Sequence, residues 1–239
     1  MRPDSAPTRI AVLASGGGTN LAALLAHLDA LGDRRRGEVV AVLSDRRSSG
    51  ALARARERRL PGLHVDPRDG GASLERALAD HDVELVVLAG YLRLVPAALT
   101  RRFRGRMLNV HPALLPAFGG PGMYGRRVHQ AVLDAGARVS GVTVHFVDEE
   151  FDRGAIVAQW PVPVFDEDDA DTLAARVLQV EHALYPRVVD AVAGEAIALD
   201  DDGRVRGAFL AGPQGEHFSL ARDISPGILA SQIEMALAR

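Results

Sequence analysis

The chain has 239 residues and a formal net charge of −3, so its composition gives no overall attraction to nucleic acid or to an anionic membrane. It contains neither lysine nor cysteine, which excludes a Schiff-base or P-loop lysine, a thiol nucleophile, disulfides and a cysteine-based zinc site. Hydrophobic residues make up 47% of the sequence, enough to bury the core of one large domain.

The first hundred residues alternate between short apolar runs and amphipathic segments. The apolar runs predict strands, and leucine or alanine at helical spacing predicts the helices between them. This alternation is typical of an α/β fold with a doubly wound, mostly parallel sheet and helices on both faces. We predict strands at residues 9–14, 39–43, 63–65 and 83–89, and helices near 21–28, 48–59 and 74–81.

The second half continues with three further strands and a long helix. Pro161 and Pro163 place the last of these strands at a sheet edge, since proline cannot donate to a ladder. Gly136 and Gly194 are suitable helix C-caps, and Pro186 predicts an interruption of the long helix. We predict strands at 107–110, 141–147 and 156–164, helices at 126–135, 169–193 and 224–239, and a hairpin over 196–209 that turns at 201–203.

A glycine-rich loop follows the first strand. In Ser15–Asn20, three glycines let the backbone turn sharply, and Thr19 or Asn20 can cap the next helix. Exposed amides at a helix start favour an anion such as phosphate, although a tight turn that binds nothing is an equal alternative. The glycines are consecutive, unlike a dinucleotide fingerprint, and the Walker lysine is missing.

Asn109 and His111 end a predicted strand two residues apart, so they can point to the same face. Ligands bind at the carboxyl ends of strands in such sheets, and an amide beside an imidazole can stabilise an oxyanion. On these residues alone, a core histidine and a strand-ending asparagine are the simpler interpretation.

Four carboxylates crowd residues 148–152, and most of them must be solvated. One of them can face a cleft and orient His111 or hold a water for proton transfer. His129, His145 and His182 are singly more typical of structural residues, and none has the close helical spacing of a zinc motif, so we expect no metal.

Five segments together resemble the glycinamide ribonucleotide formyltransferases, in family order over about residues 9–208. They are the glycine loop 15–21, Leu88-Ala89-Gly90-Tyr91-Leu92-Arg93, Asn109-Val110-His111-Pro112-Ala113-Leu114-Leu115-Pro116, Val144-His145-Phe146-Val147 with Asp152-Arg153-Gly154, and Gln179-Val180-Glu181-His182-Ala183-Leu184-Tyr185-Pro186. Each segment is moderately specific, and five in order are highly specific.

The resemblance implies transfer of a formyl group from 10-formyltetrahydrofolate, as co-substrate, to the amine of glycinamide ribonucleotide. It assigns catalysis to Asn109, His111 and Asp152, with protonated His111 stabilising the oxyanion and His145 in support. Further implied contacts are Gly18, Thr19 and Asn20 with phosphate, Glu181 with ribose, and Leu92, Arg93, Leu94, Val95, Asn109, Val147 and Asp148 with folate.

The same resemblance implies a formyltransferase domain over residues 1–208, with a nucleotide-binding half at about 9–105 and a folate-binding, catalytic half at about 106–208. Residues 209–239 are an extension without a family counterpart. A family arginine before the third predicted helix is replaced by Asp69-Gly70-Gly71-Ala72, with Arg68 or Arg76 as substitutes, and the loop 118–125 is longer than in many members.

Three rival functions remain open. A formyltetrahydrofolate deformylase shares the Asn-His-Asp set, but it normally carries an N-terminal regulatory domain and lacks this glycine run. A methionyl-tRNA formyltransferase needs a larger, basic C-terminal domain to bind tRNA. A non-catalytic nucleotide-binding protein would have an altered triad.

With no signal peptide and no long apolar run, we expect a cytoplasmic monomer or homodimer that binds neither nucleic acid nor membrane.

Overall fold

The computed structural model describes residues 6–207 and 230–234. Seven strands form one sheet in the order β3-β2-β1-β4-β5-β6-β7, and a separate hairpin pairs β8 with β9. The strands are β1 Thr8–Leu13, β2 Gly37–Ser44, β3 Gly62–His64, β4 Leu85–Leu88, β5 Met107–His111, β6 Val139–Phe146, β7 Ile156–Pro163, β8 Ile197–Leu199 and β9 Val205–Gly207. The helices are α1 Thr19–Leu31, the short 3-10 turn η1 Gly32–Arg34, α2 Gly50–Glu57, α3 Ala72–Asp80, α4 Ala97–Arg102, α5 Arg126–Asp134 and α6 Ala170–Ala193.

The sheet is parallel from β3 to β5 and antiparallel from β5 to β7. The doubly wound α/β prediction is therefore confirmed, and Pro161 and Pro163 lie on the edge strand β7 as expected. The strand order reverses between β1 and β4. This switch point opens a crevice at the carboxyl ends of the strands, where ligands bind in open α/β sheets.

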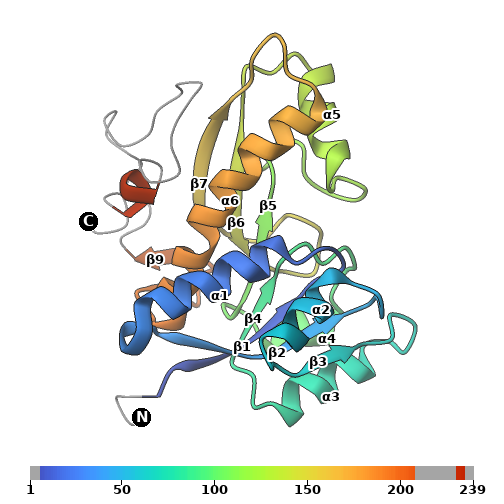
Figure 1. The fold of residues 1–239 in the computed structure, drawn as a ribbon, viewed down its shortest axis with the longest axis vertical. Helices are drawn as coiled ribbons and strands as arrows, with labels where there is room; N and C mark the ends of the chain where they lie inside the picture. Colours follow the sequence, from blue (N-terminus) through green and yellow to red (C-terminus); the bar gives the residue numbers. More distant parts are fainter. Residues whose placement is uncertain (1–5, 208–229, 235–239) are drawn as a thin grey trace.

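The two faces of the sheet carry two separate apolar clusters. The larger cluster packs α1, α2, α5 and α6 on one face, and the smaller one packs α3 and α4 on the other. Figure 1 shows α1 and α6 lying against each other across the larger face. None of the helices in the described part of the chain is long and apolar enough to cross a bilayer.

One predicted detail of the helices is wrong, and one helix is absent from the prediction. Pro186 does not interrupt α6, which runs unbroken for 24 residues. A proline costs the helix one backbone hydrogen bond, but α6 is clamped between the sheet, α1 and α5, and Pro186 itself is buried. Helix α4 was not predicted at all, because its six residues are too few to show a helical period.

Beyond the hairpin, residues 230–234 pack against the body of the protein. The predicted hairpin is confirmed over residues 197–207, with Gly203 in its turn at a φ of 77°. Of the predicted terminal helix, residues 230–234 are described and are helical, while the rest lies outside the described residues. Ile233 is fully buried in the larger cluster, and Arg187 of α6 donates to Glu234 across 2.7 Å.

These contacts make residues 230–234 part of the folded body. Ile233→Asp places an unpaired charge in the larger apolar cluster, so we expect the free energy of unfolding to fall by about 2–3 kcal/mol. For a chain of this size that lowers Tm by roughly 4–12 °C in a thermal melt. Glu234→Gln is the control, because an exposed ion pair contributes about 1 kcal/mol or less. An unchanged Tm for Ile233→Asp would show that the segment does not dock in solution.

Candidate active site

A cavity of about 460 Å³ opens at the carboxyl ends of β4 and β5. Its wall includes most of the residues that the sequence singled out. The lining residues are Asn20, Leu88, Gly90–Val95, Asn109–Pro112, Gly120, Gly122–Arg126, His129, His145, Val147, Glu150–Asp152, Ala174, Ala175, Leu178 and Glu181.

Asn109 and His111 reach the cavity from β5. Because they are two residues apart on one strand, both side chains leave the same face of the sheet. The His111 ring is buried, and its Nε2 lies 2.9 Å from the carbonyl oxygen of Phe118. A carbonyl only accepts, so Nε2 carries a proton. In the neutral ring, Nδ1 is then the free base, and it lies 3.5 Å from Asp152 Oδ2.

His145 fixes the orientation of the Asn109 amide. It stands directly opposite Asn109 in the antiparallel pairing of β5 with β6. Its Nδ1 donates to the carbonyl of Phe146 at 2.8 Å, so in the neutral ring Nε2 accepts a hydrogen bond from Asn109 Nδ2 at 3.1 Å. The second amide hydrogen of Asn109 has only a long contact of 3.5 Å to Asp152 Oδ1.

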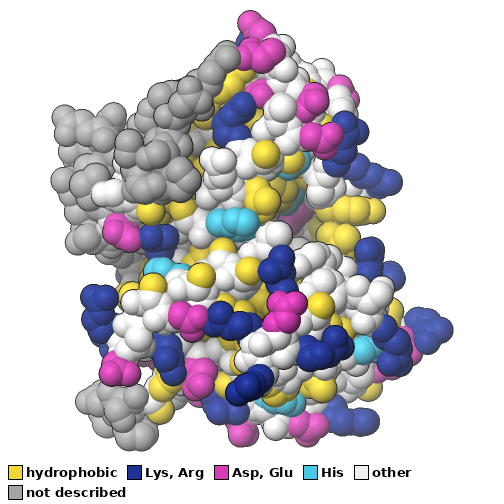
Figure 2. All heavy atoms as spheres, viewed as in Figure 1, with side chains coloured by type: hydrophobic (Ala, Val, Ile, Leu, Met, Phe, Trp, Pro, Cys, Tyr) yellow, Lys and Arg dark blue, Asp and Glu magenta, His cyan; other side chains and the backbone are white. Residues whose placement is uncertain are grey.

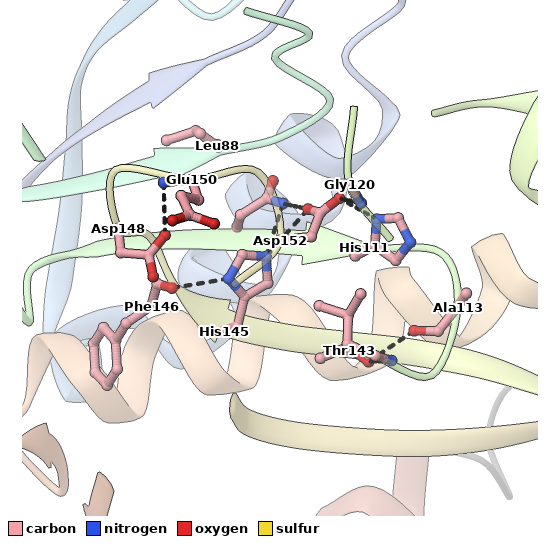
Figure 3. Close-up of polar contacts among 12 residues, drawn as sticks. Leu88, His111, Ala113, Gly120, Thr143, His145, Phe146, Asp148, Glu150 and Asp152 are labelled. Atoms are coloured by element: carbon pink, nitrogen blue, oxygen red, sulfur yellow. Dashed lines mark hydrogen bonds and ion pairs between the residues drawn. The ribbon is translucent and has the colours of Figure 1, made fainter. Parts of the chain in front are cut away.

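Asp152 joins these side chains into one cluster (Figure 3). Its backbone has a φ of 57°, a left-handed conformation that is uncommon for a residue other than glycine. The Gly120 amide donates to Oδ2 at 2.9 Å, and His145 Nε2 lies 3.6 Å from Oδ1. One carboxylate thus touches both histidines and the asparagine, and its side chain is only 9% exposed.

The charges of the cluster are set by burial and by these contacts. Burial lowers the pKa of His111 below its usual value, although Asp152 opposes the shift, so the resting ring favours the neutral form at neutral pH. Burial alone would raise the pKa of Asp152, but His145, His111 and the Gly120 amide together lower it. The resting site is therefore a carboxylate beside a His111 ring that favours its neutral form, and the protonated His111 implied for the oxyanion step stays a prediction.

The glycine loop lies where α1 begins, and neither Thr19 nor Asn20 caps the helix. Gly18 is the N-cap, in a left-handed conformation, and no side chain bonds to the first amides of α1. A Cβ on Gly18 would lie 2.8 Å from the backbone of Ala51, so only glycine fits. The uncapped amides remain available to an anion.

Asn20 instead turns towards α6, where its Nδ2 donates to Glu181 Oε2 at 2.6 Å. Both side chains are buried in the cavity wall, and Asn20 Oδ1 has no partner among the described residues. Burial raises the pKa of Glu181 to about 7. The predicted phosphate residue Asn20 and the predicted ribose residue Glu181 thus form one hydrogen-bonded pair.

The opposite wall carries the residues predicted to bind folate. Leu92, Arg93, Leu94, Val95 and Val147 line the cavity. Asp148 does not; its Oδ1 accepts a hydrogen bond from the backbone of Glu150, and Glu150 and Phe151 line the cavity in its place. The two substitutes for the family arginine, Arg68 and Arg76, are also absent from the wall, and Arg68 is paired with Asp66.

The two walls belong to different faces of the sheet. Asn20 and Glu181 come from α1 and α6, over the larger apolar cluster. Val95 belongs to the smaller cluster, and Tyr91 and Val147 pack against it.

Figure 2 shows basic side chains, all of them arginine, interspersed with acidic ones around α1 and α2 in the lower part of this view, so this surface has no single sign of charge.

Sequence reasoning missed several residues of the site. The Gly120 amide, which holds Asp152, lies in a loop whose path the sequence did not show. Thr143 anchors the loop after β5 by accepting from Leu115 and donating to the carbonyl of Ala113. The buried Tyr185 hydroxyl lies 2.9 and 3.0 Å from the carbonyls of Leu88 and Leu108, tying α6 to two strands.

Across the described residues, no three His, Asp or Glu side chains form a group that could hold a metal ion.

Comparison with known proteins places this geometry in a family. The formyl transferase family matches residues 8–189. A chloroplastic phosphoribosylglycinamide formyltransferase of Arabidopsis thaliana is 44% identical over 202 residues, covering 82% of this chain and 68% of that protein. The crystal structure of glycinamide ribonucleotide transformylase 1 from Symbiobacterium toebii superposes with a TM-score of 0.75 at 39% identity, covering 84% of this chain and 93% of that one.

A formyltetrahydrofolate deformylase from Pseudomonas syringae also shares the fold, with a TM-score of 0.73 and 25% identity over 84% of this chain and 66% of that one. Similarity of fold alone thus does not separate transferase from hydrolase. The family match spans the glycine loop, the Asn109–His111–Asp152 cluster and Glu181, and the chain belongs to the formyl transferase family.

Proposed function

We propose that this protein transfers the formyl group of 10-formyltetrahydrofolate to the amine of glycinamide ribonucleotide. The products are formylglycinamide ribonucleotide and tetrahydrofolate, in purine biosynthesis. One observation carries the proposal: a single cavity holds the Asn109–His111–Asp152 cluster and the Asn20–Glu181 pair, near the uncapped start of α1. A deformylase needs the first of these features but not a ribonucleotide site.

The ribonucleotide lies along the wall built by α1 and α6. Its phosphate accepts from the backbone amides of Gly18, Thr19 and Asn20 at the start of α1. Its ribose hydroxyls donate to Glu181, whose carboxylate is held by Asn20. The folate enters along residues 92–95 and Val147, so its reactive nitrogen meets the amine beside Asn109.

Formyl transfer needs an oxyanion donor. The amine nitrogen attacks the formyl carbon, a C–N bond forms, and negative charge develops on the formyl oxygen. Asn109 donates to that oxygen with the amide hydrogen that makes only the long contact to Asp152, while His145 retains the other. Such a donor, already oriented, is typically worth about 3–4 kcal/mol in the transition state.

The same step needs a proton relay. His111, resting as the neutral base, takes the proton that the amine loses, and Asp152 stabilises the imidazolium that forms beside the oxyanion. When the bond from the formyl carbon to N10 of the folate breaks, the proton passes to N10, with a water held by Asp152 completing the path. Atoms and charges balance without a metal or a covalent enzyme intermediate.

A spectroscopic assay with 10-formyltetrahydrofolate, with and without glycinamide ribonucleotide, tests this function. We expect tetrahydrofolate to appear only when the ribonucleotide is present. Equal loss of the formyl group without the ribonucleotide would identify a deformylase. Absence of turnover with both substrates would refute the enzymatic proposal.

Gly18→Ala tests the phosphate site. The new methyl group would collide with the backbone of Ala51, and the residue would be held at an unfavourable φ of 73°. The amides of the loop must then shift, so we expect the KM for the ribonucleotide to rise at least about tenfold, while the KM for the folate stays within about twofold. Gly16→Ala is the control, because no atom lies within 4 Å of the place its new methyl group would take. Equal effects of the two substitutions would contradict the assignment.

We further propose a cytoplasmic enzyme that acts as a monomer or homodimer. Both cavity walls come from one chain, which supports a site that is complete in each copy. Light scattering of the purified protein measures which of the two states it adopts.

A further inference from the structure

His129 lies in the cavity wall but was interpreted from the sequence as a structural residue. It belongs to the first turns of α5, on the helix face that also buries Val128 and Val132. Its side chain lines the cavity and is only 4% exposed. A histidine buried this deeply normally has a hydrogen-bond partner, because an unpaired polar group is costly to bury.

His129 has no such partner within the described chain. Its Nδ1 is fully buried and unpaired, and no hydrogen bond or ion pair involves either ring nitrogen. This differs from the other two histidines of the cavity, since His111 and His145 each bond to a backbone carbonyl. Because the ring lines the cavity and Nε2 is not among the fully buried unpaired atoms, Nε2 is the ring nitrogen that a ligand in the cavity can reach.

The fold indicates which of the two substrates His129 faces. Helix α5 packs against α6, the helix that carries Glu181, and Val132 of α5 belongs to the larger apolar cluster. The folate wall, with Val95 and Val147, belongs to the opposite face of the sheet. His129 therefore lies on the ribonucleotide side of the cavity.

The position of His129 along the ribonucleotide side of the cavity is given by its relation to His111. His129 and His111 both line the cavity. Burial and the charge of His111 lower the pKa of His129 to about 4, so His129 is neutral at neutral pH. A neutral imidazole offers one donor and one acceptor and adds no charge to the oxyanion site. The arm of the ribonucleotide that runs from the ribose at Glu181 to the amine at His111 carries one amide carbonyl and one amide N–H group.

We infer that His129 is a substrate-contacting residue that hydrogen-bonds the glycinamide arm of the ribonucleotide and so positions its amine for attack. This inference rests on the proposed function, because it takes the ribonucleotide as the occupant of that wall. It gives His129 a role in binding the ribonucleotide, separate from the proton relay of His111 and Asp152.

Steady-state kinetics of full-length variants test the inference. His129→Phe fills the space of the ring without its hydrogen bonds, and we expect the KM for the ribonucleotide to rise about tenfold or more, with the KM for 10-formyltetrahydrofolate within about twofold. His129→Gln keeps one donor and one acceptor, so we expect it to recover most of the wild-type KM.

A matched control is His182→Phe. His182 also has a buried ring nitrogen without a partner among the described residues, but it lies on α6 outside the cavity, so its KM values should remain at the wild-type level. An unchanged ribonucleotide KM in His129→Phe would overturn the inference. A Gln variant as impaired as the Phe variant for both substrates would assign His129 a purely structural role instead.

A second measurement on the wild-type protein keeps the test independent of variant folding. With histidine nitrogens labelled, we expect the His129 ring signals, assigned by their loss in His129→Gln, to shift when glycinamide ribonucleotide is added and to stay in place when the folate is added. Signals that move only with folate, or with neither substrate, would refute the contact. If wild-type protein does not turn over the two substrates at all, the proposed function fails, and that result is distinct from a failure at His129.

Discussion

Asp152→Asn is expected to lower kcat by about 10²–10⁴-fold, the usual contribution of a positioned acid–base group. The substitution removes the negative charge that stabilises imidazolium at His111 Nδ1, 3.5 Å away. Without that charge, His111 is a weaker base for the amine proton, and the water on the path to N10 loses its acceptor. Because Asp152 is not among the residues assigned to the phosphate, the ribose or the folate, both KM values should change by less than about threefold.

The fold should survive this substitution. The Gly120 amide donates to Asp152 Oδ2 at 2.9 Å, and the amide oxygen of asparagine can accept the same bond. Asp148→Asn is a matched control in the same loop, since the Asp148 side chain accepts a hydrogen bond from the backbone of Glu150 and does not line the cavity. We expect wild-type turnover for the control. An Asp152→Asn variant that keeps more than about a tenth of wild-type kcat would remove Asp152 from the relay.

The fold could be predicted because its signals are local. Buried parallel strands leave continuous apolar runs, and their alternation with helices fixes an α/β sheet. The prediction was wrong where tertiary packing overrides a local preference. Pro186 predicts a break in the helix, yet the burial of α6 against the sheet and α1 keeps the helix intact. Helix α4 could not be predicted because its six residues are too few to show a helical period of apolar residues.

The site was predictable only in part, for a related reason. The spacing of Asn109 and His111 on one strand places them together without any tertiary information. Their meeting with Asp152 depends on the register of β5 against β6 and on the loop that brings the Gly120 amide to the carboxylate. No local pattern records such contacts, so only resemblance to a family supplied Asp152. The folate contact of Asp148 stays a prediction, and in this structure its side chain accepts a hydrogen bond from its own loop.

His129 shows a further limit of sequence patterns. A histidine on an apolar helix face is most simply a core residue, and its burial agrees with that interpretation. Its missing hydrogen-bond partner and its place in the cavity wall are properties of the assembled fold. A pattern of residue types gives the face that a side chain occupies but not what remains unpaired there.

His111→Ala is expected to lower kcat by about 10²–10³-fold, with both substrates still bound. The ring provides the base for the amine proton and then the positive charge beside the oxyanion, and alanine provides neither. The hydrogen bond to the carbonyl of Phe118 is also lost, so the loop loses one anchor, but Thr143 still holds that loop through Ala113 and Leu115. We therefore expect a folded protein with KM values near those of the wild type.

The pH dependence of kcat separates these roles from a structural one. Burial lowers the pKa of His111, and the neutral ring is the active base, so wild-type kcat should rise as pH rises through that lowered pKa and then level off near neutrality. His111→Ala should lose this limb together with most of its turnover. Added imidazole, which fits the space that the side chain leaves, should restore part of the rate and part of the limb. A variant that is slow but keeps the wild-type pH profile would assign the base to another group, such as Asp152, whose Oδ2 lies 3.5 Å from His111 Nδ1.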